Sequence, residues 1–178
     1  MRLVILSNMA HYRRADGALV GHGATARELS ALASLFTDVR HVACLHPEPA
    51  PADALPYTAP QLTLVPVPPA GGDDLAAKLG ILAHTPGYLR AIARELRGAD
   101  AVHVRAPANL SLYAILALTL APRPRRRWIK YAGNWAPHPG EPASYRLQRA
   151  LLAGTLHRAQ VTINGAYPDQ PAHVHSFV

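Results

Sequence analysis

The sequence has little of several residue types, and each scarcity narrows what the protein can be. Cys44 is its single cysteine, so no disulfide can form within the chain. It sits in an apolar stretch, where a buried strand cysteine is expected. Charged residues make up only 16% and hydrophobic residues 49%, which excludes a disordered chain. The composition therefore predicts a globular protein, and 178 residues suit one domain with a core of its own.

Long apolar runs and clusters of metal ligands are also missing. The longest apolar stretch, 110–121, falls well short of the ~20 residues that span a bilayer, and the apolar run at the N-terminus is too short for a signal peptide. No Cys/His cluster has the spacing of a zinc site, so we expect no metal. These absences predict a cytoplasmic protein. They are also compatible with a protein that contacts the inner membrane surface peripherally.

Acidic residues are fewer than basic ones: the sequence has 11 Asp and Glu and 18 Lys and Arg, which gives a net charge of +7. Arginine supplies most of the excess, since Lys78 and Lys130 are the only lysines. A basic balance suits anionic partners such as nucleotide phosphates or acidic lipids, and we do not expect nucleic acid. The densest run, from Arg123 to Arg127, is interpreted either as a solvated connection or as a contact with an anionic membrane surface.

Apolar runs alternate with amphipathic helical periods along the chain. Strands are expected at 2–7, 39–45, 62–67, 101–104, 128–131 and 159–163, and helices at 24–36, 73–84, 85–97, 109–120 and 144–157. Asp73 or Asp74 would cap the second helix, Pro86 would open the third, and 68–72 would form a turn. The alternation predicts an α/β fold: a Rossmann-like parallel sheet with helices on both faces, in a single domain over 1–178.

The first 36 residues hold a glycine loop between a strand and a helix. Gly21-His22-Gly23 would let the backbone approach a ligand, and the following helix would direct its free N–H groups to the same spot. In an open α/β sheet, ligands bind at this rim. The loop also fits a dinucleotide-binding pattern, which suggests an NADP-binding oxidoreductase. That hypothesis is the weakest, because thirteen residues separate the loop from the strand. A purely structural glycine pair is the alternative.

Further candidates follow the other strand ends. His103 is either a core histidine or a catalytic group, whereas Arg105 is placed to bind an anion through its two-pronged guanidinium. Asn109 opens the helix that follows. Trp135 would either stack on a sugar face or fill the core. Glu141 stands just before the last helix, at the same expected rim.

Several of these segments together resemble a known enzyme family. They are Ser7-x-x-Ala10-His11-Tyr12, the Gly21-His22-Gly23 loop, Ala101 to Arg105 leading to Asn109, and Lys130-Tyr131-Ala132-Gly133-Asn134-Trp135 continuing through Gly140-Glu141 to Arg149. Across essentially the whole chain, the sequence resembles the N-terminal domain of a GT-B glycosyltransferase. The similarity is closest to the family-four group of retaining enzymes.

The resemblance implies two Rossmann-like domains that face each other across a cleft. This chain would be the acceptor-side domain, and the C-terminal domain that binds the nucleotide-sugar donor would be missing. The donor would be a substrate, so no cofactor is expected. Gly23 matches the second glycine of the family's loop near the donor phosphates, and His22 stands where many members have the first. Arg105 stands where many members have a histidine near the transferred sugar, with His103 two residues earlier.

We therefore expect a domain that helps to move a sugar from a nucleotide-sugar donor to a glycan, lipid-linked or small-molecule acceptor. The catalytic candidates are Arg105 and His103, and the substrate-binding candidates are Gly21, His22, Gly23, Asn109, Asn134, Trp135 and Glu141. The alternative is a non-catalytic partner subunit, or a sugar- or lipid-binding module, that pairs with a separate catalytic chain. The apolar end at Ser176-Phe177-Val178 leads us to expect either a cut chain or a partner.

Overall fold

The computed structural model describes residues 1–69 and 75–177, with side chains in the second range from residue 80 onward. The expected cap at Asp73 or Asp74, and most of the expected turn at 68–72, lie outside these residues. The strands are β1 (Arg2–Arg13), β2 (Leu19–His22), β3 (Asp38–Leu45), β4 (Ala54–Pro56), β5 (Leu62–Val67), β6 (Ala101–Ala106), β7 (Arg126–Tyr131), β8 (Gln160–Asn164) and β9 (Val174–Phe177). The helices are α1 (Gly23–Ala33), α2 (Leu75–Arg97), α3 (Asn109–Leu120) and α4 (Ala143–Ala153).

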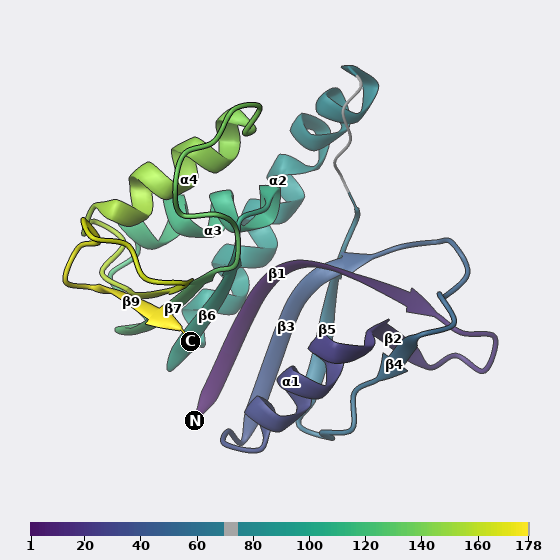
Figure 1. Ribbon diagram of the computed structural model, residues 1–178. Helices are drawn as coiled ribbons and strands as arrows, with labels where there is room; N and C mark the ends of the chain where they lie inside the picture. Colours follow the sequence, from purple (N-terminus) through teal and green to yellow (C-terminus); the bar gives the residue numbers. More distant parts are fainter. Residues whose placement is uncertain (70–74, 178) are drawn as a thin grey trace.

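Seven of the described strands form a parallel sheet in the order β5-β3-β1-β6-β7-β8-β9 (Figure 1). From β1 the chain builds outward to β3 and β5. It then crosses back through α2 to β6 and builds outward on the other side. This is the strand order of a doubly wound, Rossmann-like fold, so the predicted fold class is confirmed. The strand order reverses between β1 and β6, which is where such sheets bind ligands.

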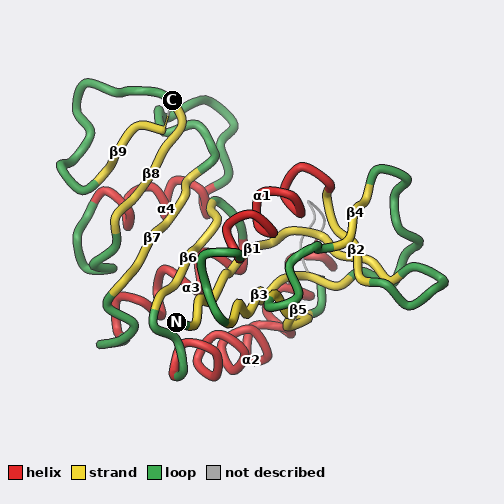
Figure 2. The backbone as a smooth tube through the Cα atoms, turned by 90° about the horizontal axis from the view of Figure 1, so that it is seen from below, coloured by secondary structure: helices red, strands yellow, loops and turns green. Residues whose placement is uncertain are grey.

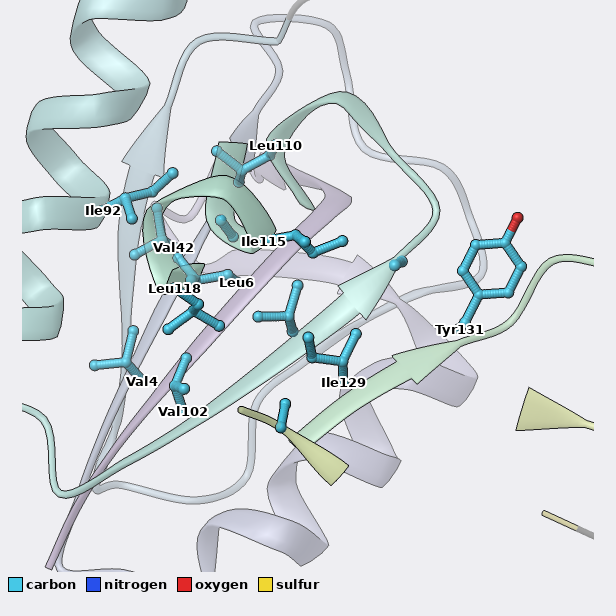
Figure 3. Packing of buried hydrophobic residues seen from close by; sticks show 14 of the residues in the cluster. Val4, Leu6, Val42, Ile92, Val102, Leu110, Ile115, Leu118, Ile129 and Tyr131 are labelled. Carbon is cyan, nitrogen blue, oxygen red and sulfur yellow. The ribbon is translucent and has the colours of Figure 1, made fainter. Parts of the chain in front are cut away.

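Helices cover both faces of the sheet, but unequally. Figure 2 shows α1 on one side of the sheet and α2 on the other. Leu29 of α1 packs with Ile5 of β1. Ile92 of α2 and Ile115 of α3 pack in the larger core with Leu6 (Figure 3). Neighbouring residues of a strand point to opposite faces, so Ile5 and Leu6 mark the two sides. Right-handed crossovers explain this division. The connection through α1 runs along the sheet from β1 toward β3, whereas those through α2, α3 and α4 run in the opposite direction and therefore lie on the opposite face. In the described chain, α1 is the sole helix on the Ile5 face.

The first strand is longer than predicted, and it turns the expected long loop into a hairpin. Beyond a shift in its register with β3, β1 continues to Arg13 and pairs in antiparallel fashion with β2. The turn closes with a hydrogen bond from the Gly17 N–H to the Arg14 carbonyl, and Gly17 has a φ of 84°. Asp16-Gly17 at this turn is a strong sequence signal for a hairpin. The glycine loop therefore begins inside a strand.

Two helices were predicted on either side of Thr85 and Pro86, and the structure instead has the single helix α2. A proline inside a helix costs about 3 kcal/mol, because it removes a backbone hydrogen bond and crowds the preceding turn. The Thr85 hydroxyl donates to the Ile81 carbonyl at 2.9 Å, and beyond the proline Tyr88 and Ile92 are buried in the core. Burial of this face outweighs the local preference for a break.

Candidate functional site

A pocket of about 430 Å³ opens at the carboxyl ends of β6 and β7 and beside the middle of β1, just past its pairing with β6, at the point where the strand order reverses. Its lining includes Ser7 of β1, His22 and Thr25 at the start of α1, Arg105 of β6 and Gly133 beyond β7. These residues are far apart in the sequence. The parallel topology brings them to one edge, as the rim rule for α/β sheets predicts.

The N-terminus of α1 borders this pocket. His22 precedes the helix, and no side chain caps its first turn. The first N–H groups of a helix have no acceptor within the helix, and they coincide with the positive end of its dipole. Thr25, in the first turn, lines the pocket. The start of α1 therefore lies at the pocket, and anion binding by its N–H groups stays a prediction.

Arg105 lines the pocket, but its guanidinium is held by a carboxylate. It binds Glu28 of α1 with two hydrogen bonds of 2.9 and 3.0 Å, and Lys130 lies 3.3 Å from the same carboxylate. The hydrogen bond from Arg105 lowers the pKa of Glu28, so the carboxylate stays ionised. Two cations thus share one anion, and the cluster keeps one net positive charge. Arg105 is positioned by α1 rather than extended toward solvent.

The structure places His103 away from this pocket. Its ring stacks on Trp128 with 3.9 Å between the ring centroids, and the residue is 1% exposed. Burial lowers the pKa of His103 to about 3, so the ring is neutral at pH 7. The geometry favours the core interpretation of His103 over a role in proton transfer at the pocket.

Both glycines of the predicted loop have packing partners inside the protein. A Cβ atom on Gly21 would lie 2.5 Å from the end of the Met9 side chain. A Cβ atom on Gly23 would lie 2.8 Å from the backbone carbonyl oxygen of Asp53. The close approach that glycine permits here is therefore to other parts of the chain.

The loop that follows β7 holds two predicted site residues, of which Trp135 is buried and Asn134 is exposed. Trp135 is 9% exposed and packs edge-on against Tyr131, with ring centroids 5.6 Å apart, so it fills the core. Asn134 is exposed, and its side-chain oxygen accepts from the Ala136 N–H and the Tyr167 hydroxyl. Asn134 therefore organises its own loop.

Asn109 and Glu141 also lie apart from the lining of the pocket. Asn109 is the first residue of α3, as expected. Glu141 is buried and forms a two-pronged ion pair with Arg149 of α4. The hydrogen bond from Arg149 lowers the pKa of Glu141, which keeps the pair ionised. This carboxylate anchors α4 to the preceding loop, and the structure does not direct it toward the pocket.

The basic run from Arg123 to Arg127 is not a uniform turn, because β7 begins at Arg126. Arg127 is buried, and its guanidinium donates to four backbone carbonyl oxygens at 2.5–2.9 Å, two of them at the end of α3. Both interpretations of the run, as a solvated connection or as a membrane contact, are therefore wrong for Arg127. The flanking arginines are exposed. In the described parts of the chain, no helix is long and apolar enough to cross a bilayer.

A buried polar network, which the sequence did not predict, lies directly behind the pocket. The Ser7 hydroxyl lies 2.7 Å from His41 Nε2, and His41 Nδ1 lies 2.7 Å from the Tyr57 hydroxyl. That hydroxyl lies 2.6 Å from His11 Nε2, and His11 Nδ1 faces two backbone carbonyl oxygens at 3.1 and 3.3 Å. Ser7 and His11 belong to a motif of the resemblance, but no local pattern marks His41 or Tyr57, because only the fold brings these separate segments together.

The contacts determine where each proton of this network sits. A carbonyl oxygen can only accept, so His11 Nδ1 carries a proton and His11 Nε2 accepts from the Tyr57 hydroxyl. The Tyr57 oxygen then accepts from His41 Nδ1, and His41 Nε2 accepts from the Ser7 hydroxyl. Burial lowers the pKa of His11 to about 4 and that of His41 well below its usual value, so both rings are neutral. Ser7 therefore donates its proton to His41, and its oxygen accepts from the Met9 N–H at 3.3 Å.

The described residues contain no group of three or more His, Cys, Asp or Glu side chains that could hold a metal ion. No protein-family model matches the chain, and no curated protein or solved structure matches it significantly. The resemblance to GT-B glycosyltransferases therefore stays a prediction that rests on the sequence motifs.

Proposed function

We propose that this chain is the acceptor-side domain of a glycosyltransferase that uses a nucleotide-sugar donor. The observation that carries the proposal is the pocket at the reversal point, where the uncapped N-terminus of α1 lies beside a cluster with one net positive charge. A nucleotide-sugar carries a diphosphate, and helix N-termini and arginines are the groups that proteins use to bind phosphate.

The chemistry of sugar transfer supports the same assignment. The leaving nucleoside diphosphate develops negative charge as the bond to the sugar breaks, and prearranged donors stabilise that charge. The N–H groups of α1 would serve this purpose from the acceptor side, together with the charge shared by Arg105 and Lys130. The remaining contacts to the donor would come from a C-terminal domain or from a partner chain.

A lipid-linked acceptor would bring the protein to a membrane surface, and one edge of the molecule suits such a contact. Leu120 at the end of α3 is 87% exposed, and it lines a hollow with Arg97 and Arg123. Exposed apolar groups beside cations favour anionic lipid surfaces. We propose peripheral contact at this edge. Loss of binding to anionic vesicles in Leu120→Ser would support the contact, and unchanged binding would argue against it.

The pocket can be tested by changing its charge without disturbing the fold. Thr25→Glu places a carboxylate in the first turn of α1, where it favours the helix dipole but repels phosphate. Thr63→Glu adds the same charge on the exposed edge strand β5 and serves as the matched control. Ligand-observed NMR with a panel of UDP- and GDP-sugars should detect binding to the chain and to Thr63→Glu, and none to Thr25→Glu.

Other results would point elsewhere. Equal binding by both variants would move the nucleotide site away from the pocket. Binding without any sugar transfer when a donor domain is supplied would favour the non-catalytic partner or binding module. A change in the absorption spectrum of NADPH on addition of the protein would favour the oxidoreductase.

A further inference from the structure

A recess lies at the other end of the parallel strands from the pocket described above. It has a volume of about 390 Å³ and lies where β6, β7 and β8 begin, next to the end of α1. Crossovers α2, α3 and α4 all lie on the other face, so in the described chain no helix covers β6 to β8 here. The topology of the fold therefore leaves a lined recess on the sheet surface.

One wall of the recess is apolar. Leu32 and Phe36, from α1 and the turn after it, face Leu3 of β1 and Ala101 of β6. Leu32 and Phe36 are only partly buried, although both pack against the smaller hydrophobic core. Contact with an apolar group in the recess would remove this surface from water, which is favourable.

The rim of the recess is strongly basic. Arg125, Arg126 and Arg158 are exposed and line it, and none of its described lining residues is acidic. The two carboxylates that flank the start of β1 are already engaged by Arg2. Asp38 accepts from its guanidinium at 2.5 Å, and Asp100 accepts from its backbone N–H at 2.7 Å. The rim arginines therefore form a charged cluster without a compensating acid in the lining.

The floor of the recess holds a buried side chain that is poorly satisfied in hydrogen bonding. His103 is 1% exposed, and neither of its ring nitrogens makes a hydrogen bond of good geometry with a described residue, although a backbone group of Trp128 lies close enough to raise its pKa in part. The neighbouring Trp128 stacks on it and directs its own Nε1 to the Thr162 hydroxyl at 2.8 Å. A poorly satisfied buried polar group costs free energy, so its retention calls for an explanation. A ligand that hydrogen-bonds to His103 supplies one.

We infer that this recess binds a phosphate monoester of an apolar alcohol. The apolar wall takes the hydrocarbon, and the rim arginines take the phosphate, whose several oxygens can accept from more than one guanidinium. The His103 ring bonds to an oxygen of the ligand. A recess of this size is within the usual range for small-molecule sites. The site is independent of the proposed glycosyltransferase function, because it shares no lining residue with the pocket at the reversal point.

Decyl phosphate, kept below its micelle concentration, is the probe that tests this site. Calorimetry should show binding at least about tenfold tighter than that of inorganic phosphate, and decyltrimethylammonium, with the same chain and the opposite charge, should not bind. Arg126→Gln and Arg158→Asn should each weaken decyl phosphate binding by about tenfold, the worth of one charge-assisted hydrogen bond. Asn is chosen at position 158 because it tolerates the φ of 53° found there. Arg90 is an exposed arginine of α2, on the other face of the sheet, and serves as the control. Arg90→Gln should bind decyl phosphate as tightly as the unmodified chain.

Two further readouts separate the possible results. Binding should shift the ¹⁵N resonances of the His103 ring, which a contact confined to the surface arginines would not do. Vesicles of phosphatidic acid and phosphatidylcholine distinguish the source of the phosphate: binding only to vesicles, still weakened by Arg126→Gln, assigns the site to a membrane lipid. Equal losses in Arg90→Gln and Arg126→Gln, tight binding of decyltrimethylammonium, or unshifted His103 resonances would each overturn the site.

Discussion

The Ser7 hydroxyl lies 2.7 Å from His41 Nε2, at the boundary between the pocket and the network behind it. The two residues are 34 positions apart, and the pairing of β1 with β3 brings them together. Ser7 lines the pocket, whereas His41 is fully buried. The hydrogen bond therefore links the lining of the pocket to the core of the protein.

Both histidines of this network should be neutral with the proton on Nδ1, although free histidine at neutral pH favours Nε2. Long-range ¹H–¹⁵N NMR of the imidazole rings distinguishes the two tautomers. In Tyr57→Phe, the link between His41 and His11 is cut, and two buried nitrogens lose their partner. That variant should lose about 2–3 kcal/mol of unfolding free energy. Tyr113→Phe is a suitable control, because its partner Thr85 keeps a bond to the Ile81 carbonyl. An Nε2–H tautomer at His41 would contradict the proton assignment.

The buried histidines should make the fold sensitive to acid. The pKa values of His11 and His103 are lowered to about 4 and about 3 by burial, and that of His41 is lowered as well. Below pH 6.5 the unfolded chain therefore binds more protons than the folded one, and stability falls as the pH falls. His11 alone should account for roughly 3 kcal/mol between pH 7 and pH 4. Urea unfolding at a series of pH values measures the slope.

A single substitution tests this explanation for the acid sensitivity. His103→Phe keeps a ring against Trp128 and removes the two poorly satisfied nitrogens, so it should be about 1 kcal/mol more stable at pH 7. It should also depend less on pH. A variant with the pH dependence of the unmodified chain would show that the pKa of His103 is not lowered in the folded protein.

Arg127 should be the one arginine of its run that the fold requires. Arg127→Leu leaves buried carbonyl oxygens without a donor and should cost about 3 kcal/mol of unfolding free energy. Arg125→Leu, two residues away and exposed, should change it by no more than about 0.5 kcal/mol. Denaturant midpoints of the two variants make the comparison. Similar small losses in both would mean that water replaces the guanidinium.

Gly23 should matter for folding before it matters for any ligand. The Cβ of Gly23→Ala would meet the Asp53 carbonyl at 2.8 Å, so the backbone must shift and stability should fall by about 1–3 kcal/mol. Gly87→Ala, inside α2 with open space around it, should instead gain about 1 kcal/mol. Thermal unfolding of both variants checks the opposite signs. If Gly23→Ala leaves the unfolding free energy unchanged, the packing of Gly23 is not what requires a glycine, and a role at the pocket becomes the better explanation.

The strand and helix pattern could be read from the sequence wherever burial and local preference agree. The apolar runs of β3 and β5, and the period of α3, were predicted within a residue because each buries one face or both. The prediction failed where packing opposes a local signal. Pro86 should end a helix, but Tyr88 and Ile92 are buried beyond it. Strand β9 was missed because its ladder bonds come from β8, a segment elsewhere in the chain.

The candidate site divides in the same way. Alternating strands and helices were enough to predict a doubly wound sheet and a rim at the strand ends, because periodicity is a property of neighbouring residues. Only the tertiary structure decided which rim residues meet. It places Ser7, Thr25 and Arg105 around one pocket, pairs Glu141 with Arg149, and buries His103 against Trp128. Side chains from distant segments acquire their partners through strand register and crossover direction, and both depend on the packing of the whole chain.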